Sequence, residues 1–399
     1  MVRRTSGSAG YTRAMTDARG ADYYPSLTGL RGIAAGWVML LHLWHYAIAP
    51  DVRLPLGAWR LDFTPLFAHG WVGVDLFFVL SGFLLSLPFL AAVRGERPWP
   101  RLAHFWAQRC RRVLPAYYVQ FFLLFIAAWI ATGVAPMGLS KVLAYLGMEF
   151  LLYPNLGPLP NPVWWSLPVE WHFYLILPLL ALLFVRLRWG LVAVLALAWV
   201  VAFRLFCVNL FYVGDPEAPV WYTTLMHLPS RIDEFVFGMI AAWFHARAPR
   251  GATRWPALAA GVVLLAWFVH RLGVLGDPLL TVRMPDLLWH YSVAGLAFAL
   301  IVYAAAGESA LAQRLFAGRA LAFLGAISYS LYLWHPIVLK TLAEHHVLER
   351  VGLDGAAWRF TLPVAPILLV SWFSYRFVER PFLRPASRPR LPQPSPAVG

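Results

Sequence analysis

The sequence predicts an all-α, polytopic integral membrane protein with roughly ten transmembrane helices and both termini in the cytoplasm. Three observations predict this fold class. Of the 399 residues, 60% are hydrophobic and only 13% are charged, which is unlike a soluble globular domain. The apolar residues gather in runs of about twenty, the length at which a helix crosses a bilayer. Arginines flank these runs mainly on one side, as the positive-inside rule describes.

The apolar runs define the expected spans, and each boundary is predicted to within a few residues. A further apolar stretch, 139–153, is short and contains Lys141 and Glu149. We therefore expect an interfacial or re-entrant helix there rather than a span. The expected spans are 28–50, 69–93, 113–134, 166–185, 189–208, 228–246, 256–272, 287–306, 321–341 and 361–380.

Lysine and arginine between these spans set the expected orientation, because positively charged flanks stay in the cytoplasm. Residues 1–27 carry four arginines and no apolar core, so we expect a cytoplasmic tail without a cleavable signal peptide. Residues 28–382 form the transmembrane domain. Residues 383–399 are rich in proline, serine and arginine and are predicted to be a disordered cytoplasmic tail.

Charge and cysteine usage exclude several function classes. The net charge of +14 comes from arginines beside apolar runs, so we expect contacts with membrane lipids and no nucleic-acid partner. Cys110 lies among arginines and Cys207 lies inside an apolar run. Neither a disulfide framework nor a thiolate metal site is expected.

Ionisable side chains inside spans are costly and therefore mark candidate sites. At the helical rise, His42 lies about 16 Å beyond Arg31, and His335 lies at a similar height, so both reach the outer half of the membrane. Several others lie near the starts of inward-running spans and are expected at that same depth. These are Asp75, Glu170, Arg231 and Glu234.

Histidine and carboxylate together in a cavity of low dielectric are suited to general acid/base chemistry. The candidate catalytic residues are therefore His42, Asp75, Glu170 and His335. For Asp75 and Glu234, a structural ion pair with Arg231 is an equally good interpretation, because buried charges need partners. His42 and His45 are spaced like two zinc ligands, but the sequence offers no clear third ligand, so we expect no metal site.

Arg109, Arg111 and Arg112 stand immediately before the third expected span. Topology and contact with anionic lipid would account for such a cluster. A site for a polyphosphate ligand would account for it too, because arginine forms paired, charge-assisted bonds with phosphate oxygens. No glycine-rich nucleotide-binding motif accompanies the cluster.

Five motifs in order closely resemble those of the acyltransferase-type-3 family of multispan membrane O-acyltransferases. In the first, Arg31 precedes His42 by ten intervening residues, like the family's Arg/Lys-to-His signature. From the first motif to the last, the resemblance extends over nearly the whole chain. They are LTGLRGIAA (27–35), GVDLFFVLSGF (73–83), WSLPVE (165–170), ISYSLYLWH (327–335) and VERP (378–381).

The resemblance implies a stand-alone membrane enzyme that moves an acyl group, expected to be acetyl, from acyl-coenzyme A to a hydroxyl of a carbohydrate or glycoconjugate. It implies the plasma membrane as location, the cell envelope as the place of modification, and no tightly bound cofactor. His42 would deprotonate the acceptor hydroxyl or carry the acyl group transiently, with Asp75 or Glu170 orienting it. The residues expected to bind coenzyme A are Arg31, Arg109, Arg111 and Arg112. Structural or acceptor-side roles are expected for Ser81, Trp165, Ser166, Tyr174, Arg231 and Glu234.

A membrane transporter is the rival interpretation, because a substrate or proton pathway also needs histidine, carboxylate and arginine at membrane depth. The two halves of the sequence show no obvious internal repeat. The cytoplasmic arginine cluster has no necessary role in a transporter. Formation of an acylated product by the purified protein would separate the two.

Overall fold

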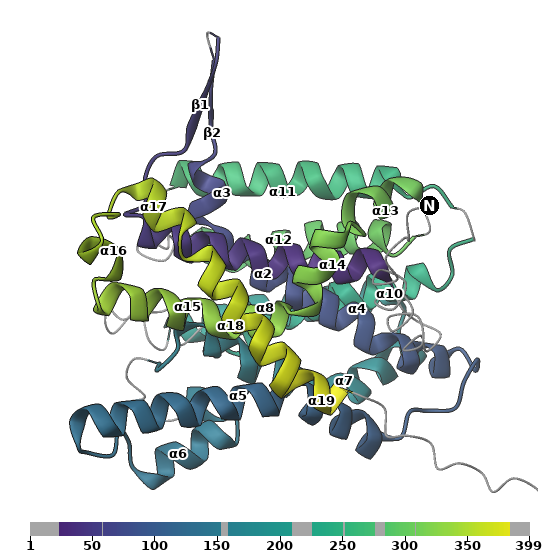
Figure 1. Cartoon of the computed structure of the whole chain (residues 1–399). Helices are drawn as coiled ribbons and strands as arrows, with labels where there is room; N and C mark the ends of the chain where they lie inside the picture. Colours follow the sequence, from purple (N-terminus) through teal and green to yellow (C-terminus); the bar gives the residue numbers. More distant parts are fainter. Residues whose placement is uncertain are drawn as a thin grey trace, which may run out of the picture.

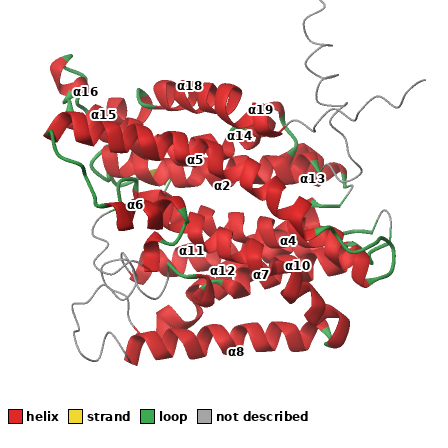
Figure 2. Cartoon of the chain, turned by 90° about the horizontal axis from the view of Figure 1, so that it is seen from below, coloured by secondary structure: helices red, strands yellow, loops and turns green. Residues whose placement is uncertain are grey.

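The structure, a computed structural model, describes residues 24–57, 59–152, 159–209, 226–249, 252–275, 284–307 and 309–383. In these ranges the protein is a bundle of long helices that share one general direction, with shorter helices at the two ends (Figures 1 and 2). The long helices are α2 (Pro25–Tyr46), α4 (Gly73–Val93), α5 (Leu102–Thr132), α7 (Ser166–Arg186), α8 (Trp189–Cys207), α10 (Ile232–His245), α11 (Trp255–Leu275), α12 (Met284–Ala305), α15 (Ser328–Glu344) and α18 (Val364–Ser374). The shorter ones are α3 (Thr64–Ala68), α6 (Leu139–Leu146), α13 (Ala310–Phe316), α14 (Arg319–Ala326), α16 (Val347–Arg350), α17 (Ala356–Thr361) and α19 (Arg380–Leu383).

The described part of the chain confirms a helical membrane protein. It contains 8 helices that are long and apolar enough to cross a membrane, or 9 if the bent pair α14 and α15 forms one span. That pair covers the predicted span 321–341 and bends by 74°. The predicted span 228–246 corresponds to α10, which has only 14 residues. The described residues thus support eight or nine spans where the sequence predicts roughly ten.

One element is not helical. Strands β1 (Arg53–Leu56) and β2 (Trp59–Asp62) pair antiparallel and project from the side of the bundle (Figure 1). Gly57 supplies the left-handed backbone of the turn at φ 61°, a conformation that glycine adopts without strain. The expectation of an all-α chain misses this hairpin, because its strands of four residues each are too short to stand out between two apolar runs of about twenty.

The stretch 139–153 does not form a long helix. It gives α6 and a short 3-10 turn at Phe150–Leu152, and residues 153–158 lie outside the described ranges. Helix α6 packs back against α5, where the hydroxyls of Tyr117 and Tyr118 donate to backbone carbonyls of α6 at 2.9 and 2.7 Å. This agrees with the expectation that the stretch is not a span.

Helix α4 lies at the centre of the bundle and packs closely against α10 and α2. Its contact with α10 depends on glycine in both helices. A Cβ atom at Gly82 would lie 2.1 Å from the carbonyl oxygen of Phe235, and one at Gly238 would lie 2.2 Å from that of Val79. Small residues let membrane helices approach this closely. Gly82 of the 73–83 motif therefore fixes the position of α4 against α10.

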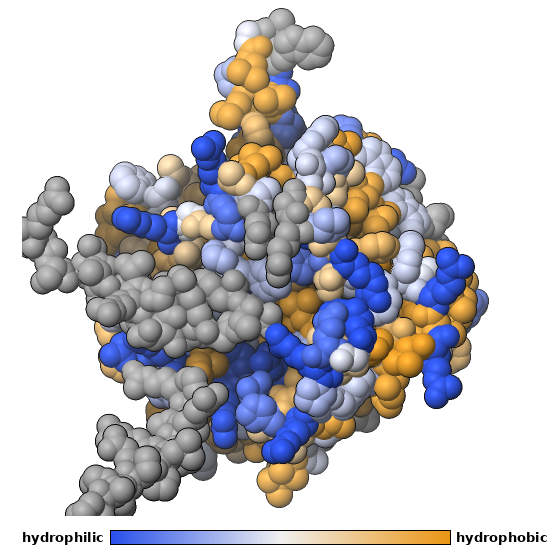
Figure 3. Space-filling view, turned by 90° about the vertical axis from the view of Figure 1, so that its right-hand side faces the viewer, coloured by the Kyte–Doolittle hydropathy of each residue, from blue (hydrophilic) through white to orange (hydrophobic). Residues whose placement is uncertain are grey.

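Both described ends of the chain lie toward the same end of the bundle, where α2 begins and α19 ends (Figure 1). Hydrophilic side chains gather on that end of the molecule (Figure 3). The predicted tails lie mostly outside the described residues. The arrangement agrees with two termini on one side, and the assignment of that side to the cytoplasm stays a prediction.

Candidate active site

A cavity of about 800 Å³ opens between α2, α4, α5, α7 and α15. At one end it is lined by polar and basic side chains of α5, and at the other by apolar and aromatic side chains. Along α4 the lining runs from Leu85 to Val74, a length of about 16 Å at the helical rise. The cavity is therefore long relative to its volume.

Four predicted donor-binding arginines, Arg31, Arg109, Arg111 and Arg112, all line this cavity. Arg111 is exposed. The Nε atoms of Arg31 and Arg109 are buried and have no hydrogen-bond partner. A buried donor without a partner costs free energy unless a ligand accepts its proton, so these two guanidiniums are available to an anion.

Arg112 differs from the other three. Its Nη1 lies 2.9 Å from a carboxylate oxygen of the fully buried Glu379. Glu379 also accepts from the Ser330 hydroxyl at the start of α15, and it ends a π-helical turn, Tyr375–Glu379. In the sequence, Glu379 stands out only as part of the motif at 378–381. The structure shows that it joins the arginine helix α5 to α15.

Glu170 lines the same cavity and accepts a hydrogen bond from Ser81. It lies close enough to Arg31, Arg109 and Tyr174 to affect their electrostatics. This corrects the expected depth, because Glu170 belongs with the arginines and not with His42. The error came from counting depth from the start of α7, which lies inside the bundle and not at its surface.

A buried polar cluster explains why α7 begins inside the bundle. The Asn161 amide donates to Gln120 of α5 at 2.9 Å and to the Leu333 carbonyl of α15 at 2.8 Å. The Trp164 indole donates to the same Gln120 oxygen at 2.7 Å. These bonds hold the turn before α7 between α5 and α15. Neither Gln120 nor Asn161 was predicted as a site residue, although polar amides in an apolar setting were the available signal.

His42 and His335 come together from α2 and α15. Their ring centroids lie 4.9 Å apart, and Nε2 of His335 lies 3.3 Å from Nδ1 of His42. Nδ1 of His42 lies 2.9 Å from the Val38 carbonyl, and Nδ1 of His335 lies 2.8 Å from the Leu331 carbonyl. A carbonyl only accepts hydrogen bonds, so both Nδ1 atoms carry protons. In the neutral pair, Nε2 of the half-buried His42 is then left as a free base.

The histidine pair lies just beyond the cavity. Arg31 and His42 are eleven residues apart, close to three full turns, so they lie on the same face of α2. On α15, Tyr332 lines the cavity and His335 follows one turn later, with ring centroids 6.2 Å apart. The structure therefore places the arginines, the cavity and the histidines in that order.

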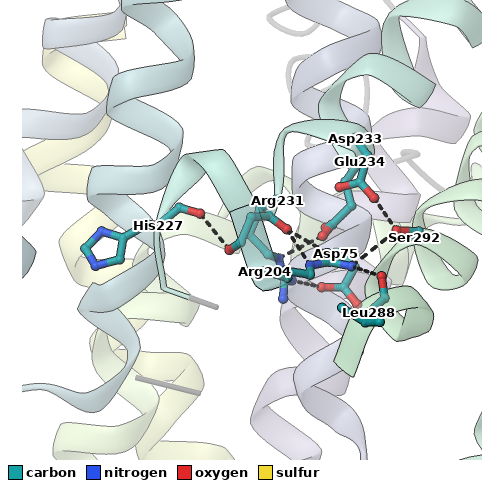
Figure 4. A network of polar contacts seen from close by, with 9 residues as sticks. Asp75, Arg204, His227, Arg231, Asp233, Glu234, Leu288 and Ser292 are labelled. Atoms are coloured by element: carbon teal, nitrogen blue, oxygen red, sulfur yellow. Dashed lines mark hydrogen bonds and ion pairs between the residues drawn. The ribbon is translucent and has the colours of Figure 1, made fainter. Parts of the chain in front are cut away.

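Asp75 lies in a separate network of buried charges (Figure 4). Arg231 bonds to Asp75 and, through Nε, lies 2.7 Å from Glu234. Asp233 accepts from Ser292, and Arg204 donates to the Ser230 and Leu288 carbonyls at 2.6 and 2.7 Å. Of the two interpretations given for Asp75, the ion pair is the one seen. No contact described for His42 involves Asp75 or Glu170, so the expected carboxylate partner is replaced by His335.

The remaining predicted residues all lie near these groups. The Trp165 ring lies 5.7 Å from the guanidinium carbon of Arg231. The Ser166 hydroxyl lies 2.7 Å from that of Tyr332, and Tyr174 lines the cavity. In the described part of the chain, no three His, Cys, Asp or Glu side chains are grouped to hold a metal ion.

A family model described as an acyltransferase domain matches residues 24–376. The chain belongs to this acyltransferase family. The match confirms the resemblance drawn from the motifs, and it includes α2, α4, α5, α7 and α15, which enclose the cavity.

Several named proteins have similar sequences. The chain is 28% identical to the peptidoglycan O-acetyltransferase OatA of Listeria monocytogenes over 381 residues, which cover 90% of the chain and 56% of OatA. It is 25% identical to the putative peptidoglycan O-acetyltransferase YrhL of Bacillus subtilis over 378 residues, covering 90% and 55%. It is 22% identical to a putative O-acetyltransferase of Staphylococcus aureus strain COL over 402 residues, covering 93% and 59%. The chain thus spans little more than half the length of these relatives, and no solved structure matches it.

Proposed function

We propose that this protein is a membrane O-acyltransferase that moves an acetyl group from acetyl-coenzyme A to a hydroxyl of a cell-envelope carbohydrate. The observation that carries the proposal is the order of the site: arginines with free donors, a long cavity, and a histidine pair with a free nitrogen. The names of the relatives support O-acetylation of a carbohydrate. Their peptidoglycan acceptor is a candidate for this chain as well.

The cavity supports an acyl-coenzyme A donor. Arg109 and Arg111 at its mouth, with Arg31 inside, present guanidiniums that suit phosphate oxygens. The apolar side chains of α4 then offer a narrow passage for the acyl-pantetheine arm. Arg112 is held by Glu379, so it serves mainly to position α5 and α15. We propose that donor enters from the cytoplasmic end of the bundle.

His42 is the proposed general base. The acceptor hydroxyl gives its proton to Nε2 of His42 while its oxygen attacks the thioester carbonyl carbon. The carbon–sulfur bond then breaks, and the coenzyme A thiolate leaves with the proton from His42. The imidazolium formed in between is stabilised at Nδ1 by the Val38 carbonyl and by Nε2 of His335. This charge is stabilised by dipoles, whereas a serine hydrolase uses a carboxylate.

The test is product formation by the purified protein in lipid nanodiscs. Radiolabelled acetyl-coenzyme A is supplied with disaccharide fragments of peptidoglycan, and the products are identified by mass spectrometry. The proposal predicts an O-acetyl ester on the sugar together with an equal amount of free coenzyme A. Uptake of either compound into sealed vesicles without a covalent product would instead support the transporter interpretation.

A further inference from the structure

Two aromatic rings narrow the end of the cavity that lies nearest the histidines. Phe77 of α4 and Tyr332 of α15 both line the cavity and meet edge to face, with ring centroids 6.0 Å apart. Beyond Tyr332 lie His335 and then His42, at centroid separations of 6.2 and 4.9 Å. Four rings therefore form a continuous row from the cavity end to the proposed base.

Tyr332 is the fixed member of this end wall. It is almost fully buried, and its hydroxyl donates to the Val163 carbonyl at 2.9 Å. The same hydroxyl lies 2.7 Å from that of Ser166. A ring held at its far end by two partners cannot swing away without leaving buried polar groups unpaired. Tyr332 therefore sets a rigid limit on the α15 side.

Phe77 closes the opposite side. Its ring packs against the apolar cluster that contains Ala35 and Met39 of α2. These two residues share a helix face with Arg31 and His42, because the spacings are four, four and three residues. Phe77 thus stands beside the line that leads from the arginine to the base, at the place where the tip of a donor would arrive.

We propose that Phe77, against the fixed Tyr332, limits the donor to a short acyl group such as acetyl. This inference rests on the proposed function. With the thioester at the end of the cavity nearest the histidines, the carbons beyond its carbonyl must share the space that is lined by Phe77, Tyr332, Val74 and Ser166. The two rings narrow this space, so each additional carbon of a longer chain would have to displace the Phe77 ring. Phe77 is accordingly a specificity-determining residue.

The experiment compares acetyl-, propionyl- and butyryl-coenzyme A as donors, with kcat/KM measured for the protein in nanodiscs. For the wild type, acetyl is the preferred donor. Phe77→Ala should raise the butyryl-to-acetyl ratio by roughly tenfold, because each buried methylene is worth about fourfold in binding. Phe77→Leu removes less volume and should raise mainly the propionyl ratio, which keeps the test valid if the alanine variant folds poorly.

Leu84→Ala is the matched control. Leu84 lines the same cavity from the same helix, two turns from Phe77 and about 10 Å nearer the mouth. It should leave the chain-length ratios as in the wild type. An unchanged ratio in both active Phe77 variants, or an equal rise in Leu84→Ala, would overturn the inference and leave the acyltransferase proposal standing. Failure of the wild type to transfer any acyl group would overturn both.

Discussion

The histidine pair and the Arg231 network both bury polar groups inside the bundle, but they satisfy them differently. Arg231 bonds to the carboxylates of Asp75 and Glu234, and its guanidinium carbon lies 3.8 Å from the centroid of the Tyr291 ring. In the histidine pair, each ring is anchored through Nδ1 to its own helix. The free nitrogen of His42 has no counterpart in Arg231, whose charge is compensated on several sides.

This difference separates a structural cluster from a reactive one. Buried charges that neutralise each other hold helices together. Here Arg231, at the start of α10, pairs with Asp75 of α4, and the nearby Asp233 accepts from Ser292 of α12. A base must keep one atom free for substrate while its orientation is fixed by other atoms. The histidine pair meets that condition. Both regions contain predicted catalytic residues, and only their contacts distinguish them.

The largest effect is expected from His42→Ala. Loss of a general base lowers turnover by about 10²- to 10⁴-fold, measured as acetyl transfer per inserted protein. His45→Ala is the control, because His45 lies on the same helix, is exposed and also bonds through Nδ1 to a backbone carbonyl, at 3.1 Å. Near-normal turnover by the His42 variant would show that the pair is not the base.

Arg231→Met should act on stability. It leaves Asp75 and Glu234 buried without their partner, which costs about 3–5 kcal/mol. Thermal unfolding of the detergent-solubilised protein should therefore shift down strongly, whereas His42→Ala should unfold like the wild type. If Arg231→Met unfolded normally and lost only turnover, the network would belong to the catalytic machinery.

The arginines allow the same contrast to be tested at the cavity mouth. Arg109→Gln and Arg111→Gln should raise the KM for acetyl-coenzyme A by about tenfold or more each, because each removes charge-assisted bonds to the donor. Their kcat at saturating donor should stay close to normal. Arg112→Gln should instead lower thermal stability, since it leaves the buried Glu379 without its ion-pair partner. If all three variants raised KM equally and none lost stability, Arg112 would be a donor-binding residue like the other two.

The smallest effect is expected from His335→Phe. It removes the nitrogen that faces Nδ1 of His42 but leaves the Val38 carbonyl as a second acceptor. Because the Nδ1 proton of His42 keeps one of its two acceptors, the expected fall in kcat is roughly threefold to tenfold. Donor KM should not change. A loss as large as that of His42→Ala would instead assign His335 a direct chemical role.

Composition and motifs predicted the membrane class, most of the spans, the cavity arginines and the two histidines. These features follow from local properties of the chain: apolar length, flanking charge and residue spacing. The depth of Glu170 could not be predicted, because it depends on the buried bonds that Asn161 makes with α5 and α15. The partner of Asp75 and the role of Glu379 depended in the same way on contacts between distant segments.

The central claim is that the donor enters at the end of the bundle that carries the chain termini, and we propose that the acceptor reaches His42 from the opposite face. Sidedness of the reaction tests this arrangement most directly. Arg31 and His42 are about 16 Å apart along α2, with the cavity leading from one toward the other. In sealed vesicles of uniform orientation, acetyl-coenzyme A should support transfer only from the face that carries the chain termini. A membrane-impermeant acceptor should be modified only from the opposite face. Transfer with both substrates confined to the terminal face would contradict the account.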